Sequence, residues 1–121
     1  MPPDPPSISF ANNVQPIFNR SCATSTACHQ GPLPAADLNL TAGVSYGQTV
    51  DVRSSSRPAL FRVLPGKPDE SYLVLKIEEG IPGDTLMPLG CPTAPQGGAV
   101  CPTPDEIESI RTWVAECAPD N

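Results

Sequence analysis

The sequence predicts a small, mostly α-helical domain in which short helices are separated by proline- and glycine-rich loops. The chain has 121 residues, which is the size of one domain. Its 17 prolines and 9 glycines punctuate the apolar stretches. Aromatic residues make up only 5% of the composition, so few large apolar side chains are available for a core. We therefore expect a bound apolar group to complete the core.

The chain divides into a short leader and one folded domain. Residues 1–7 are expected to form a proline-rich leader or linker, and residues 8–121 the domain. The opening residues contain no apolar stretch of the kind that a signal peptide carries. No run reaches transmembrane length, so we expect no membrane-spanning segment.

The N-terminal half predicts two short helices. The first begins near Asn13 and turns three apolar side chains to one face, those of Val14, Ile17 and Phe18. A loop over residues 30–41 follows. Thr41 is expected to cap a second short helix that reaches about Thr49.

The C-terminal half predicts a surface loop, an extended stretch and two helices. The loop covers residues 54–58 and the extended stretch residues 59–64. Residues 68–70 start a helix that ends at Gly80, and four of its side chains recur at helical spacing, namely Tyr72, Leu73, Lys76 and Ile77.

The last helix carries the strongest local signals. Thr103 is a good N-cap, Pro104 suits the first helical position, and Glu106 completes a capping box. The apolar residues that follow recur on one face: Ile107, Ile110, Trp113, Val114 and Cys117. We expect this helix to cross the first one.

Two cysteines, the second followed directly by a histidine, point to covalent haem attachment. The usual motif is C-x-x-C-H, whereas here five residues separate Cys22 from Cys28, and His29 follows. A longer spacer can bulge outward without moving Cys28 relative to His29, which leaves only the thioether of Cys22 open. Met87, in a stiff proline- and glycine-rich loop, offers the thioether that the opposite face of the iron would need.

Several blocks of the sequence resemble small bacterial c-type cytochromes. The blocks occur in the family's order, at residues 10–22, 62–74, 87–90, 107–114 and 118–121. The resemblance covers roughly residues 8–121. The chain departs from the family in its longer spacer, in the inserted loop over residues 91–101 and in Cys117.

The resemblance implies a small cytochrome c-like fold around one covalently bound haem c. Cys28, and Cys22 if its thioether forms, would attach the haem, while His29 and Met87 would ligate the iron from opposite sides. The same resemblance gives cofactor-binding roles to two further residues, Arg62 with a propionate and Tyr72 with the porphyrin or a propionate. An exposed surface position for Arg62 stays open. Leu38 and Leu40 would face the haem edge.

The function implied is one-electron transfer at the cell envelope rather than enzymatic catalysis. The chain would work with redox partner proteins, as a monomer or as a domain of a larger envelope protein. Haem attachment in this family takes place outside the cytoplasm, so a periplasmic or extracellular location and a removed leader are expected. Five cysteines in a short chain agree with an oxidising compartment. The net charge of −6 argues against nucleic acid as a partner.

Two alternatives remain open at this point. One is a metal-binding module in which Cys22, Cys28, His29 and Met87 hold copper, because soft sulfur ligands select Cu(I). The other is a haem protein whose Met87 is labile, which would give it peroxidase or sensor behaviour.

The remaining cysteines predict one disulfide. Cys91 and Cys101 enclose a turn-forming sequence, and a disulfide between them would stiffen the chain between Met87 and the last helix. Cys117 is expected to be a buried, inert thiol, although it could pair with Cys22 if Cys22 is not bound to haem.

Overall fold

The computed structural model describes residues 6–24, 28–31, 34–78, 86–88, 91, 93, 95 and 98–121. Within these ranges the chain forms four α-helices and three shorter helical turns. The α-helices are α1 (Gln15–Ser21), α2 (Ser45–Thr49), α3 (Tyr72–Glu78) and α4 (Pro104–Ala115). The described residues contain isolated β-bridges but no strand, which confirms the mostly α-helical class.

The first helical segment begins earlier than the sequence predicts. A π-helical turn, η1 (Phe10–Val14), precedes α1 and runs directly into it. The hydroxyl of Ser9 accepts a hydrogen bond from the amide of Asn12 at 3.1 Å, and this side-chain cap starts the turn ahead of Asn13. Pro16 lies at the start of α1, where it removes no intrahelical hydrogen bond.

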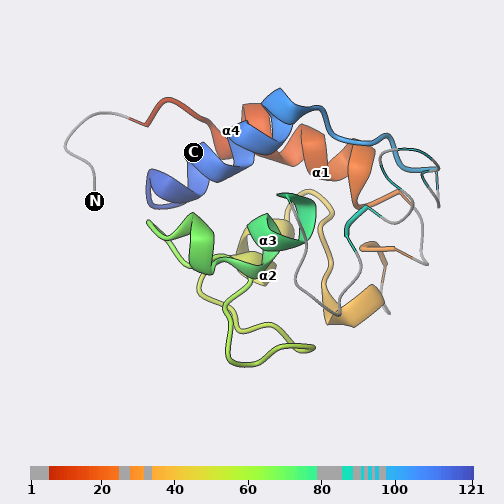
Figure 1. The fold of residues 1–121 in the computed structure, drawn as a ribbon, viewed down its shortest axis with the longest axis horizontal. Coiled ribbons are helices and arrows are strands. Elements are labelled where there is room, and N and C mark those ends of the chain that lie inside the picture. Colours follow the sequence, from red (N-terminus) through yellow and green to blue (C-terminus); the bar gives the residue numbers. More distant parts are fainter. Residues whose placement is uncertain are drawn as a thin grey trace.

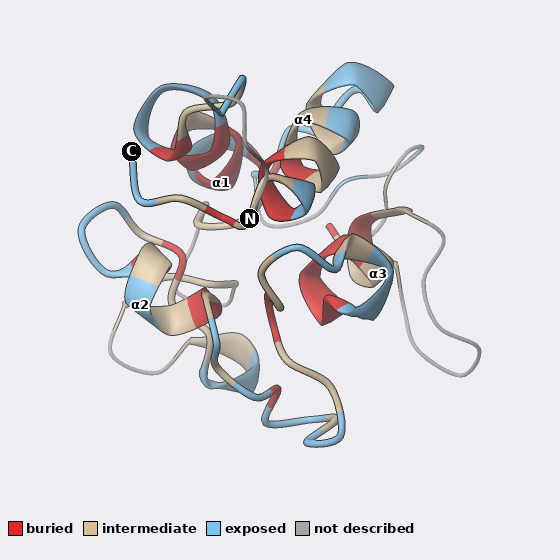
Figure 2. Cartoon of the chain, turned by 90° about the vertical axis from the view of Figure 1, so that its left-hand side faces the viewer, coloured by how far each residue is buried: buried red, intermediate tan, exposed pale blue. Residues whose placement is uncertain are grey.

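The first and last helical segments pack together, as expected. In Figure 1, α1 and α4 lie side by side across the top of the molecule. The rings of Phe10 and Trp113 approach to 5.1 Å between centroids, and Trp113 and Phe18 are fully buried. Figure 2 shows the buried faces of α1, α3 and α4 turned toward the interior. This apolar contact closes the domain by bringing its two ends together.

The predicted capping box of α4 is confirmed, but the predicted position of Cys117 is wrong. The hydroxyl of Thr103 accepts from the amide of Glu106, and the carboxylate of Glu106 accepts from the amide of Thr103. The helix ends at Ala115, so Cys117 does not belong to its apolar face. Cys117 has a φ of 74° and is half-buried. The left-handed backbone turns the chain out of the helix at this point.

The second helix also differs from its prediction. Thr41 does not cap it, because the N-cap position is Val44, and the Thr41 hydroxyl donates to Asn39 Oδ1 at 2.7 Å. A turn over residues 41–44 comes first, and α2 covers Ser45–Thr49 only. Local side-chain hydrogen bonding of this kind competes with helix formation.

The segment before α3 is more irregular than predicted. The turn η3 (Pro68–Glu70) is a 3₁₀ turn, and Ser71 separates it from α3. The expected helix end at Gly80 lies outside the described residues. The stretch over residues 59–64 is extended only around Phe61 and Val63, which form isolated bridges.

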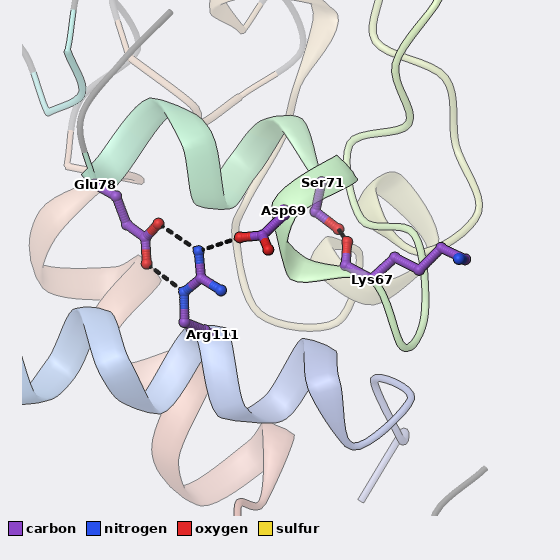
Figure 3. Close-up of polar contacts among 5 residues, drawn as sticks. All are labelled: Lys67, Asp69, Ser71, Glu78 and Arg111. Atoms are coloured by element: carbon purple, nitrogen blue, oxygen red, sulfur yellow. Dashed lines mark hydrogen bonds and ion pairs between the residues drawn. The ribbon is translucent and has the colours of Figure 1, made fainter.

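A bidentate ion pair joins α3 to α4. The guanidinium of Arg111 in α4 donates to both carboxylate oxygens of Glu78 at 2.6 and 2.7 Å. It also donates to Asp69 of η3 at 2.7 Å. Figure 3 shows Arg111 reaching up from α4 between these two carboxylates. Because residues of α3 also line a cavity, this contact helps to set the position of the cavity wall.

The two chain ends are fastened by side chains of the C-terminal segment. The carboxylate of Glu116 accepts hydrogen bonds from the amides of Ser7 and Ile8 and from the hydroxyl of Ser7. Asn121 accepts from the amide of Phe10 at 2.8 Å. Among the described residues, Ser7 and Ile8 are thereby tied to the end of α4. No helix in the described ranges has the length and apolar character needed to cross a membrane.

Candidate functional site

A cavity lies between the segment that follows α1, the face of α3 and the Met87 segment. It encloses about 690 Å³, including its open mouth. The lining side chains are Cys22, His29, Ala36, Leu38, Leu40, Thr49, Ser54, Ser56, Arg62, Tyr72, Leu73, Lys76, Ile77 and Met87.

A backbone hydrogen bond joins the two ends of the segment from Cys22 to His29. Cys22 follows α1 directly and donates its amide to Phe18 O at 2.9 Å. The amide of His29 donates to the carbonyl of Cys22 at 3.2 Å, although the two residues are seven positions apart. Residues 25–27 of the spacer lie outside the described residues. The hydrogen bond keeps the two ends of the long spacer together, so that Cys22 and His29 reach the same cavity.

The ring of His29 is oriented by the loop that follows it. Its Nδ1 lies 2.9 Å from the carbonyl oxygen of Leu38. A carbonyl can only accept, so Nδ1 carries the hydrogen and Nε2 keeps a lone pair. Burial lowers the pKa of His29, and the positive charges of Arg62 and Lys76 add to the lowering. A neutral imidazole with a fixed tautomer is the form that binds a metal ion.

The two cysteines of the motif lie in different surroundings. Cys22 packs against the core and lines the cavity, and desolvation together with the neighbouring Cys28 raises the pKa of its thiol to about 12. Cys22 is therefore protonated at neutral pH. Cys28 is not among the residues that line the cavity. Its sulfur accepts from the hydroxyl of Thr24 at 3.9 Å, and its carbonyl accepts from the amide of Ala35 at 2.8 Å.

Met87 reaches the same cavity from a segment far along the chain. Its amide donates to the carbonyl of Lys76 in α3 at 2.7 Å. The peptide bond between Met87 and Pro88 is cis, and Pro88 is buried. Met87 and His29 both line the cavity, and ligation of an iron by them from opposite sides stays a prediction.

Arg62 is buried in the cavity wall rather than exposed on the surface. Only 8% of the residue is exposed. Its guanidinium donates to three backbone carbonyls, those of Gln48, Ala36 and Asp37, at 2.9, 3.1 and 3.3 Å. Burial lowers the pKa of Arg62, and Asp37 offsets this in part. Within the described residues no carboxylate forms an ion pair with Arg62.

The cavity is positive although the protein is acidic. Arg62 and Lys76 line it, and none of the described lining residues is an aspartate or glutamate. The ammonium of Lys76 lies 5.7 Å from the ring centre of Tyr72. Three hydroxyl groups stand on the same wall, those of Thr49, Ser54 and Ser56. The rest of the lining is largely aliphatic. This combination fits a large apolar molecule that carries negative charge.

Five of the six residues singled out in the sequence meet in the cavity, and Cys28 is the exception. Leu38 and Leu40 line it too, as expected for the loop that contains them. Sequence reasoning missed Ser54 and Ser56, which were placed in a surface loop, and the sequence carries no signal for them. The position of Lys76 could have been inferred, because it follows Tyr72 by one helical turn.

The described residues contain no group of three or more His, Cys, Asp or Glu side chains arranged to hold a metal ion. Comparison with protein-family models, with curated proteins and with solved structures found no match for this chain. The function of the chain therefore has to be inferred from the chemistry of the cavity.

Proposed function

We propose that this chain is a monohaem c-type cytochrome domain that carries single electrons. The observation that carries the proposal is the cavity itself, where Cys22, His29 and Met87 meet beside two cationic side chains. Haem c is a large apolar ring with two carboxylates, and when bound it would supply the one-electron couple.

The donor set of the chain fits this group. The Nδ1 of His29 is held by the carbonyl of Leu38, which orients the ring at the cavity, and Met87 brings a thioether to the same space. Cys22 supplies a thiol at the cavity wall, and Cys28 is adjacent to His29 in the sequence. The aliphatic lining would exclude water, and Arg62 and Lys76 would orient the carboxylates.

The metal-module alternative has less support. A copper site is surrounded mainly by its ligands, whereas much of the lining of this cavity is aliphatic. Arg62 and Lys76 would also repel a bare cation in a space without carboxylates. The other alternative, a haem protein with a labile Met87 that acts as a peroxidase or sensor, would use the same cavity. Ligand binding to the haem distinguishes it from an electron carrier.

The proposed setting is outside the cytoplasm, with redox proteins as partners and no catalytic role of its own. The disulfide between Cys91 and Cys101 supports this setting, because disulfides persist in oxidising compartments. Periplasmic or extracellular electron transfer is the corresponding proposal.

The test is expression in a host that attaches haem to exported proteins. Denaturing mass analysis should find one covalently bound haem, and the reduced spectrum should be that of a low-spin c-type haem. The double variant Cys22→Ser/Cys28→Ser should abolish covalent attachment, whereas Cys117→Ser, outside the cavity, should leave it unchanged. A colourless protein with stoichiometric copper or zinc would contradict the proposal. A haem that binds added ligands without hindrance would favour the peroxidase or sensor alternative.

A further inference from the structure

We infer that the Cys91–Cys101 disulfide is a positioning element for the cavity, which ties the segment of Met87 to the end of α1 that leads into Cys22. The sequence predicts that this disulfide stiffens the chain between Met87 and the last helix, and the structure adds the attachment to the end of α1. The inference rests on the proposed function for its consequence, because Met87 and Cys22 would be the haem contacts that the disulfide holds.

The Cys91 end of the disulfide is attached to the Met87 segment. The amide of Cys91 donates to the carbonyl of Pro88 at 3.1 Å, which closes a turn directly after Met87. Met87 in turn donates its amide to Lys76 of α3. Cys91 is thus held within one turn of the cavity wall.

The Cys101 end is attached to α1. Val100 donates its amide to the carbonyl of Arg20 at 3.0 Å, and the hydroxyl of Ser21 donates to the carbonyl of Val100. Arg20 and Ser21 are the last two residues of α1, and Cys22 follows them. Arg20 also forms an ion pair with Glu106 in the first turn of α4, which fixes this end further. In Figure 1 the chain leading into α4 passes the end of α1 at this point.

The disulfide completes the connection between these two attachments. Its sulfurs join Cys91 to Cys101, ten positions apart, so the Met87 segment is cross-linked to the neighbour of Val100, which is hydrogen-bonded to the end of α1. Without it, fewer contacts would oppose local opening of the Met87 segment, among them the hydrogen bond from Met87 to Lys76. Met87 would then leave the cavity more often.

The experiment compares the parent protein with Cys91→Ser/Cys101→Ser and with the control Cys117→Ser, which removes a thiol outside the disulfide. Hydrogen exchange of the Met87 amide, followed by NMR, needs no haem. We expect this amide to exchange at least about tenfold faster in the double variant and at the parent rate in the control. In the haem-loaded protein, we expect imidazole to bind at least about tenfold more tightly in the double variant.

A second variant keeps the test decisive if the double variant does not fold. Ser21→Ala leaves the disulfide intact and removes the hydroxyl that donates to Val100, and it should also accelerate exchange of the Met87 amide. Unchanged exchange in the folded variants would overturn the inference. Faster exchange in a protein that takes up no haem would support the positioning role and overturn the proposed function instead. Haem uptake together with unchanged exchange of the Met87 amide would support the proposed function and overturn the positioning role.

Discussion

Removing the guanidinium of Arg111 should weaken the domain mainly through the loss of Glu78 as a partner. The two hydrogen bonds to Glu78 are short and charge-assisted, and the side chains are 27% and 21% exposed. Hydrogen bonds to charged groups contribute about 1.5–3 kcal/mol, and partial exposure reduces this value. The Asp69 carboxylate is 82% exposed, so its pair with Arg111 should contribute less than about 0.5 kcal/mol.

We therefore expect a coupling energy of about 1–2 kcal/mol between Arg111 and Glu78. For a chain of this size, that corresponds to about 4–8 °C in the midpoint of thermal unfolding. The measurement is a double-mutant cycle built from Arg111→Ala, Glu78→Ala and the combined variant, with free energies of unfolding from urea titrations. The matched cycle with Asp69→Ala is the control, because it removes the more exposed carboxylate of the same network (Figure 3).

Equal coupling in the two cycles would refute this reasoning, since it would mean that the buried geometry of the Glu78 pair adds nothing. A coupling below about 0.3 kcal/mol in both cycles would show that the ion pairs form without stabilising the contact of α3 with α4. Arg111→Lys should recover only part of the loss, because an ammonium cannot make the bidentate contact.

Three further outcomes are expected. Met87→Ala should abolish the sulfur-to-iron charge-transfer band and lower the reduction potential of the haem-loaded protein, and an unchanged spectrum would leave Met87 as a packing residue. Cys22→Ala should retain haem through Cys28 but shift the pyridine haemochrome band, because one vinyl group becomes free; the absence of a shift would mean that Cys22 forms no thioether. Hydrogen bonds from the Ser7 backbone, the Ser7 hydroxyl and the Ile8 amide lower the pKa of Glu116. The Glu116 carboxylate therefore stabilises the fold at a pH above the ordinary carboxyl pKa. This stabilisation is lost as the pH falls through the lowered pKa of Glu116. The stability difference between the parent and Glu116→Gln should accordingly be visible at pH 7 and shrink below about pH 4, and a difference independent of pH would contradict the role of the Glu116 charge.

The elements with complete local signals could be predicted from the sequence. Thr103, Pro104 and Glu106 satisfy the first amides of α4 within four residues, so the start of this helix does not depend on the rest of the fold. The disulfide between Cys91 and Cys101 was predictable for a similar reason, because the short enclosed segment keeps its ends close. For the motif that contains Cys22 and His29, the sequence showed only the spacing of the residues.

Where the outcome depended on a distant partner, the sequence was insufficient. Thr41 has the chemistry of a helix cap, but its hydroxyl forms a local hydrogen bond with Asn39, and α2 starts later, with Val44 at the N-cap. Cys117 continues the apolar period of α4, but the helix ends two positions earlier, at Ala115, and Cys117 itself is left-handed. The orientation of the His29 ring depends on the carbonyl of Leu38, which no spacing rule connects to it.

The sequence by itself determined which chemical groups this protein has available: two thiols, the single histidine beside one of them, and a remote methionine in a stiff loop. Only the tertiary structure decided that Cys22, His29 and Met87 share one cavity, because hydrogen bonds between residues far apart in the chain bring them there. Burial likewise decided the role of Arg62, which the sequence allowed to be an ordinary surface cation. Its guanidinium lies in the cavity wall because three backbone carbonyls compensate the loss of water around it, and the same burial makes its charge available to an anionic ligand.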